Sequence, residues 1–332
     1  MWASERLRQV APPRLDVANV CPTMRAAVLS LVLLLPCAFR GQTLAPRAYL
    51  VTPINSNAFT VTANFYNGDV LFSNTLPITG AQGSIQLFVP TLYHSLNFFG
   101  RSANITAGIP YSVGNFSAIV TDHREDVYRS GIGDTVVRLA VNLKGGPAMK
   151  LPEFLKWKQK VLLGASLTVS LPTGQYDPTK LVNIGINRWA FKPEFGYSQR
   201  WGNWILDGYA GCWFFTTNPE FFSRNMYFPG TRSQSQNPIG VFEGHLSHDF
   251  KPRLWASVDG NFWFGGVTSL NGIPNRATLQ RNSRVGATFS TPISKHQSLK
   301  FSYANGAYIR FGGDYQAVSV AWQYSWIGRH LQ

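Results

Sequence analysis

The chain has 332 residues, of which 45% are hydrophobic but only 14% are charged, against roughly 25% charged in an ordinary soluble domain. The formal net charge is +14, yet the Lys and Arg residues are dispersed and form no recognised binding motif, which argues against nucleic acid as a partner. After residues 24–38, no run approaches the ~20 apolar residues that a spanning helix needs, which argues against a helical membrane protein.

The first 41 residues have the layout of an export signal. From Met24, MRAAVLSLVLLLPCAF has one basic residue followed by an apolar core, as secretory signals do. We expect residues 1–23 to be a leader or a mis-assigned start, 24–41 a signal peptide, and 42–57 a periplasmic or plug segment. Cleavage would leave Cys212 as the one cysteine, which allows neither an internal disulfide nor a cysteine metal cluster.

The rest of the chain is dominated by alternation of apolar and polar residues. In AVSVAWQYSW, residues 317–326, the large apolar residues Val, Val, Trp, Tyr and Trp share one parity. A period of two is typical of a strand whose faces meet different environments. The pattern recurs in segments of about ten to thirteen residues, the length of a tilted transmembrane strand. We predict twelve strands, at residues 58–67, 84–95, 100–110, 132–144, 159–171, 187–200, 203–215, 237–250, 252–265, 281–293, 297–310 and 314–326.

The connections between the predicted strands alternate in length. Tight turns near residues 202, 252 and 296 alternate with long polar stretches. The long stretches are residues 111–131, 172–187, 216–237 and 265–281. Short turns at one end and long loops at the other are typical of an outer-membrane barrel, and an even strand number returns both termini to the periplasm. The predicted fold class is therefore all-β, a transmembrane antiparallel barrel of about twelve strands over residues 58–326, with a tail at 327–332.

Aromatic residues gather near both ends of the predicted strands. Those near the turns are Trp201, Trp204, Tyr324 and Trp326, and those near the loops are Trp189, Phe214, Phe264 and Tyr308. Two such groups are expected where a barrel crosses the two membrane interfaces. A soluble β-sandwich would bury aromatic residues in its core, but it has no second interface to explain two groups.

The polar parity of the strands carries charges of both signs. The lumen-lining candidates are Arg138, Lys192, Glu194, Asp207, Glu243, His245, Asp259, Arg284 and Lys300. Because side chains do not completely fill a twelve-stranded lumen, these residues either pair across it or line a path for a polar or amphipathic solute. We predict no catalytic residue, no cofactor and no metal site, since the six His residues show no metal-ligand spacing.

Two local motifs offer other chemistry. In KHQSLK, His296 and Ser298 are similar to the His-Gln-Ser string of twelve-stranded outer-membrane phospholipases, but no Asn-Gly follows and the string lies at a predicted periplasmic hairpin. DHRED, residues 122–126, places three carboxylates in a predicted loop, where they could contact divalent cations or lipopolysaccharide.

Two longer motifs resemble a known family. They are GIGDTVVRLAVNLKG at residues 131–145 and SLPTGQYDPTKLVNIGINRWAFKPEFGYS at residues 170–198. With the closing hairpin, they resemble the outer-membrane family named for the meta pathway of phenol degradation, whose members are often called transporters. The resemblance covers Leu44 to Trp326 and implies a barrel distantly like the long-chain fatty acid channels, passing small hydrophobic or aromatic compounds. One departure is that residues 327–332 follow Trp326, whereas such barrels usually end on an aromatic residue for the assembly machinery.

The sequence therefore predicts an exported outer-membrane channel or transporter for passive uptake of small hydrophobic, aromatic or anionic molecules. The expected partners are the lipid bilayer, lipopolysaccharide, the outer-membrane assembly machinery and a small solute. Two alternatives stay open: a plugged structural or adhesive barrel, and a lipid-modifying enzyme that depends on Ser298. The pattern specifies neither the solute nor whether the protein is a monomer or a homo-oligomer.

Overall fold

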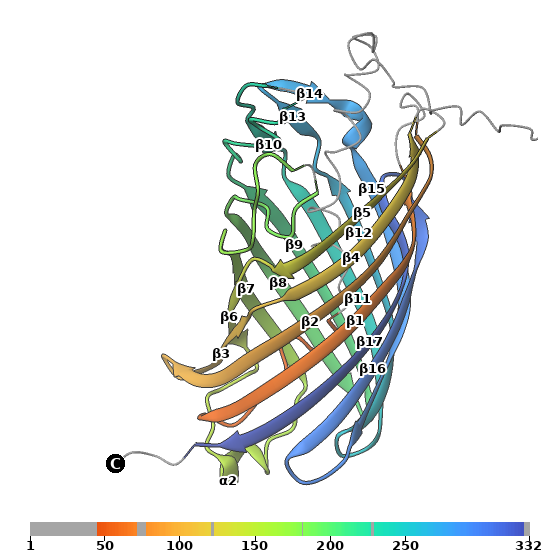
Figure 1. Ribbon diagram of the computed structural model, residues 1–332. Coiled ribbons are helices and arrows are strands. Elements are labelled where there is room, and N and C mark those ends of the chain that lie inside the picture. Colours follow the sequence, from red (N-terminus) through yellow and green to blue (C-terminus); the bar gives the residue numbers. More distant parts are fainter. Residues whose placement is uncertain (1–44, 72–77, 121–122, 181, 227–228, 329–332) are drawn as a thin grey trace, which may run out of the picture.

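The fold is a closed antiparallel β-barrel, seen in the computed structural model of residues 45–71, 78–120, 123–180, 182–226 and 229–328 (Figure 1). The strands that close the barrel are β1 (Ser56–Leu71), β2 (Ile78–Phe98), β3 (Arg101–Gly108), β6 (Val136–Lys144), β7 (Val161–Ser170), β8 (Ala190–Trp201), β9 (Trp204–Phe215), β11 (Ile239–Lys251), β12 (Leu254–Gly265), β15 (Gln280–Pro292), β16 (Gln297–Ile309) and β17 (Gly312–Ile327). Strand β1 pairs with β17 on one side and β2 on the other, which leaves this twelve-stranded ring of the described chain without an edge. The predicted fold class is confirmed.

One predicted loop was wrong. Residues 111–131 form most of a hairpin, β4 (Tyr111–Val120) and β5 (His123–Ile132), in which β4 continues β3 and pairs with β2. The hairpin rises toward the end of the barrel that carries the long connections (Figure 1). The run at residues 123–126, His-Arg-Glu-Asp, is polar on both parities, so it lacks the apolar face that marks a spanning strand. The backbone of β4 pairs with β2, and β5 pairs with β4. This pairing makes both segments strands, and the amino-acid composition does not indicate it.

The two parities of the strands face different surroundings, as the alternation predicts. On β17, Val318 and Trp322 are 47% and 36% exposed, whereas Tyr315 and Ala321 are 0% and 3% exposed. The large apolar residues therefore cover the outside, where lipid would contact them. All eight aromatic residues of the two predicted girdles are between 38% and 60% exposed.

The two ends of the barrel differ. At the loop end, β10 (Gln234–Gln236), β13 (Thr268–Leu270) and β14 (Ile273–Asn275) form a small separate sheet, which the 3-10 helix η2 (Arg276–Thr278) follows. At the turn end, the connection from β6 to β7 contains α2 (Leu151–Phe154), where Glu153 Oε2 accepts a hydrogen bond from the Lys150 N–H at 3.0 Å. Ser56 lies opposite Ile327, so the barrel begins and ends at the turn end.

No helix in the described part of the chain is long and apolar enough to cross a membrane.

The parity assignment predicts opposite responses at two adjacent residues of β17. Val320→Arg would place a charge among lipid chains and should lower the free energy of unfolding by about 2–4 kcal/mol if the site is near the bilayer midplane. The arginine of Ser319→Arg would point into the barrel and should change the free energy of unfolding little. Urea unfolding in phospholipid vesicles measures both variants, and an equal loss at the two positions would contradict a lipid-facing outer surface.

Candidate functional site

Residues 45–55, here called the inner segment, enter the barrel ahead of β1. Tyr49 is 2% exposed, and its hydroxyl lies 3.0 Å from both Ser166 Oγ and Glu194 Oε1. Its ring packs edge-on against Tyr209, with the ring centroids 5.3 Å apart. The inner segment is thus held by side chains of β7, β8 and β9.

Two glycines make room for the Tyr49 ring. Gly164 and Gly196 are directly paired across β7 and β8, and a Cβ at either position would overlap the ring. Burial first, and then the charge of Glu194, raise the pKa of Tyr49 to about 12. Because the docked state favours the protonated phenol, the stabilisation from the Tyr49 phenol is fully present below the ordinary pKa of 10.0 and is lost as the pH rises from there through about 12.

Arg47 holds the inner segment closer to the turn end. Its guanidinium lies 2.7 Å from an Asp249 oxygen and donates to Ser247 Oγ at 3.1 Å. Its backbone N–H donates to Asp207 Oδ2 at 3.3 Å. Arg200 contacts the other oxygen of Asp249 at 2.8 Å. Two arginines therefore share one carboxylate of β11, a charge-assisted arrangement that is stronger than neutral hydrogen bonds.

Above these contacts, charged side chains form a chain across the interior, here called the lumen charge network. Its contacts are Arg138–Glu194 at 3.7 Å, Lys192–Glu194 at 2.6 Å, Lys192–Glu243 at 3.9 Å, His245 Nε2–Glu243 at 3.6 Å and His245 Nδ1–Asp259 at 2.8 Å. Asp259 also accepts hydrogen bonds from Ser257 and Thr288. Pairing is what makes such burial tolerable, because an unpaired charge away from water is strongly destabilising.

The structure joins most of the sequence-predicted candidates, but not all. Six belong to the lumen charge network, and Asp207 binds the inner segment. Arg284 is fully buried, and its guanidinium nitrogens have no hydrogen-bond partner among the described residues. Lys300 is half-buried and makes no ion pair in that part of the chain. Sequence reasoning missed Arg47 and Tyr49, which precede the first strand and lie in no periodic pattern.

A cavity of 440 Å³ lies inside the barrel, with the lumen charge network at one end. Its walls are largely aliphatic and aromatic. They include Ala48 of the inner segment, Ile85, Leu87 and Val89 of β2, Phe116 of β4, Val136 of β6, Ile184 and Ile186 of the loop between β7 and β8, and Tyr209 and Trp213 of β9. The polar end is formed by Arg138, Lys192, Glu194 and Glu243.

The two sequence motifs meet at the wall of this cavity. Asp134 is 5% exposed, and its carboxylate accepts hydrogen bonds from the N–H groups of Gly174 at 3.0 Å and Ile186 at 3.1 Å. A Cβ on Gly174 would lie 2.8 Å from the backbone at Gly133, so glycine allows the close approach. The Asp of the first motif thereby fixes the loop of the second, residues 171–187, against the junction of β5 and β6.

His296 and Ser298 are not brought together. The His296 Nδ1 lies 3.0 Å from the carbonyl oxygen of Ser325, and Ser298 Oγ donates to Gln323 Oε1 at 3.4 Å. No hydrogen bond joins the two side chains in the described chain, so the motif does not form the nucleophile–base contact that a hydrolase uses.

The Asp134 contacts predict a local effect of one substitution. Asp134→Ala leaves two N–H groups without their acceptor, which should destabilise the docked loop by about 1–3 kcal/mol per buried group. Amide hydrogen exchange at Gly174 and Ile186 should then be faster. Asp177→Ala in the same loop is the control, because that partly exposed carboxylate contacts Thr179 and Lys180, its close neighbours in sequence. Unchanged exchange in the Asp134 variant would refute the assignment.

The Tyr49 contacts predict how the inner segment obstructs the lumen. Tyr49→Ala removes the ring packed against Tyr209 and both hydroxyl contacts, so ion conductance in planar bilayers should rise. Tyr49→Phe keeps the ring and should show a smaller increase. If the alanine variant conducts like the unmodified protein, Tyr49 does not hold a constriction.

Comparison with solved structures found similar proteins. The COG4313 outer membrane channel from Pseudomonas putida F1 is similar at a TM-score of 0.70 and 14% identity, over 86% of this chain and 100% of that chain. The β domain of the Bordetella autotransporter BrkA gives 0.49 at 12% identity, over 82% and 100%. The Pseudomonas putida toluene transporter TodX gives 0.41 at 9% identity, over 82% and 89%.

At 14% identity, the likeness to the channel at a TM-score of 0.70 shows the fold, which indicates an outer-membrane location. No curated protein matches the chain. The model of the family described as the MetA-pathway of phenol degradation matches residues 49–324, most of the sequence. The chain therefore belongs to the family of the MetA-pathway of phenol degradation.

Proposed function

We propose that the protein is a passive outer-membrane channel for small hydrophobic, aromatic molecules. The observation that carries the proposal is the interior cavity of 440 Å³ with largely apolar walls, a size within the range of small-molecule sites. An apolar interior lowers the free energy of an apolar solute relative to water. The family name, which refers to phenol degradation, suggests the same class of solute.

The charges at the cavity favour a neutral solute over an anion. Arg138 and Lys192 are matched there by Glu194 and Glu243. Asp134 also lines the cavity, so two cations there meet three carboxylates. Anion selectivity needs an excess of positive charge, which this lining does not have. The same end of the cavity offers donors and acceptors to one polar substituent, such as a hydroxyl group on an aromatic ring.

The inner segment supports a second assignment, in which residues 42–57 act as a plug. Ala48 lines the cavity, and Tyr49 and Arg47 bind across the lumen below it. Passage to the periplasm would then require the segment to shift. We also assign residues 24–41, which lie outside the described residues, to an export signal. Residues 58–326 are assigned to the barrel that the assembly machinery inserts, and the chain to transport and not to catalysis.

Filling the cavity tests the transport proposal. Leu87→Trp and Ile184→Trp add bulk to the walls of the cavity and should reduce uptake of radiolabelled monoaromatic compounds by intact cells to the level of cells that lack the protein. Phe88→Trp is the matched control, because Phe88 is the neighbour of Leu87 on the opposite parity and packs against the exposed Phe65. Aromatic acids and sugars in the same assay report selectivity.

Each outcome of the uptake assay decides between the candidate functions. Preferential uptake of aromatic acids would replace the neutral solute with an anion. Equal uptake by filled and control variants would remove the cavity from the pathway. No uptake of any compound by the unmodified protein would favour a plugged structural barrel.

A further inference from the structure

Three arginines lie close together at the loop end of the barrel. Arg276 belongs to η2, Arg281 to the start of β15, and Arg310 follows β16. The Arg310 guanidinium donates to the carbonyl oxygen of Leu279 at 3.0 Å, and its N–H donates to Asn282 Oδ1 at 2.9 Å. These bonds fix Arg310 beside the segment that joins Arg276 to Arg281. We call these residues the rim arginines.

The rim arginines carry uncompensated charge. All three side chains are exposed, and none makes an ion pair within the described residues. Two carboxylates of the same rim, Asp69 and Asp314, face each other across β1 and β17 and also form no ion pair with them in that part of the chain. A guanidinium presents several N–H donors in a planar fork that matches the oxygens of a phosphate.

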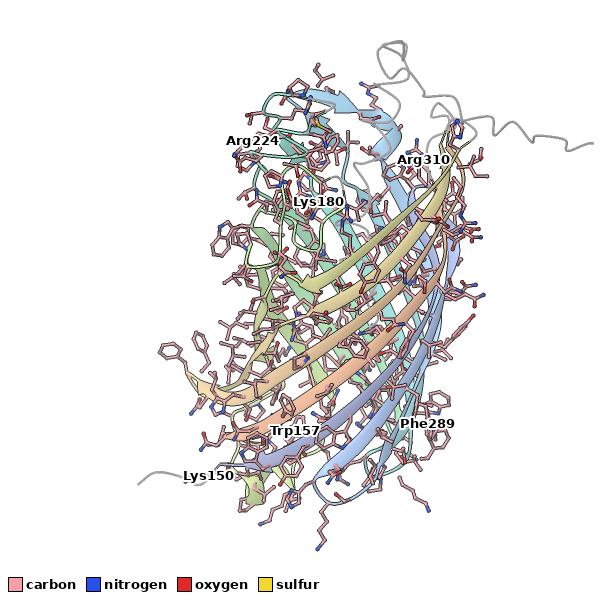
Figure 2. The ribbon with its side chains drawn as sticks, in the orientation of Figure 1. Lys150, Trp157, Lys180, Arg224, Phe289 and Arg310 are labelled. Carbon is pink, nitrogen blue, oxygen red and sulfur yellow. The ribbon has the colours of Figure 1, made fainter. Side chains whose placement is uncertain are left out.

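Aromatic neighbours indicate the depth of this cluster in the membrane. Arg281 lies directly opposite Phe264, which is 46% exposed, and Tyr308, opposite Ser283 on the next strand, is 60% exposed. Exposed aromatic residues of this kind mark the interface between hydrocarbon and headgroups. Arg310 is at the upper end of the strands in Figure 2, the end that faces outward in barrels with this loop asymmetry. The rim arginines are therefore at the level of outer-leaflet headgroups.

We propose that Arg276, Arg281 and Arg310 form a binding site for the phosphate groups of the anionic glycolipid of the outer leaflet. The guanidinium groups bind phosphate, and Phe264 and Tyr308 contact the apolar part of the same lipid. This assignment depends on the outer-membrane location and is independent of which solute the lumen carries.

Another arc of the rim provides a contrast. Lys180 lies 3.1 Å from Asp177, and Arg224 is paired with Glu220. Figure 2 shows Lys180 and Arg224 to the left of Arg310, toward the loop end of the barrel. Because these cations already have carboxylate partners, they offer less positive charge to a phosphate. They serve as a matched control for exposed cations at the same end of the barrel.

Lipid retention by the purified full chain tests the site. Native mass spectrometry would compare bisphosphorylated lipid A, its dephosphorylated form and phosphatidylglycerol. The unmodified protein should retain bisphosphorylated lipid A and lose it when the phosphates are absent. The triple variant Arg276→Gln, Arg281→Gln, Arg310→Gln should bind it roughly a hundredfold more weakly, because each lost cation near an anionic surface weakens binding about fivefold. The control variant Lys180→Gln, Arg224→Gln should bind like the unmodified protein.

Three results would overturn the proposal. The first is retention of lipid A by the triple variant, and the second is an equal loss in the control variant, which would indicate diffuse attraction between charges. The third is equally tight retention of phosphatidylglycerol by the unmodified protein, which would assign the cluster to anionic lipids in general. Heat-modifiable mobility on electrophoresis verifies that each variant is folded, and the comparison of the two lipid A forms needs no variant at all.

Discussion

The whole structure depends on pairing the backbone where no water is available. In hydrocarbon an unpaired N–H or C=O costs several kcal/mol, so a sheet there must close on itself, and β1 does this by pairing with both β17 and β2. Closure of the sheet then determines where the side chains point and which of them must be paired. Successive side chains must point alternately to lipid and to the interior, and every polar group that the interior receives has to find its partners there.

In the interior, polar groups find partners in oppositely charged side chains and in the inner segment. The Glu194 carboxylate is contacted by Lys192, Arg138 and the Tyr49 hydroxyl, which come from two barrel strands and the inner segment. One acidic side chain therefore connects the wall to the segment inside it. The apolar cavity lies beside this contact, so structural pairing and the proposed passage of solute share the same residues.

Much of the barrel could be predicted because lipid imposes a period of two on every spanning strand. From β7 to β17, the predicted spanning strands agree with the structure to within three residues at each end. The β4–β5 hairpin was missed because its polar run at residues 123–126 has no apolar parity. Parity selected Glu194 and Asp259 as inward residues but could not indicate which partners each meets, since that depends on register between strands. Tyr49 and the Asp134 contacts needed the fold, because their partners are distant in sequence.

The covalent link between the inner segment and β1 has a consequence for binding equilibria. Ser56, the first residue of β1, comes only seven positions after Tyr49, a reach of about 25 Å at roughly 3.5 Å per residue. A segment on so short a tether keeps an effective concentration in the millimolar range at its own binding surface. A free molecule that competes for the Tyr49 position with equal affinity must therefore be present above this local concentration. A molecule with higher affinity needs a proportionately lower concentration, however dilute the protein is. The segment acts as an intramolecular competitor whose occupancy is independent of the amount of protein in the membrane.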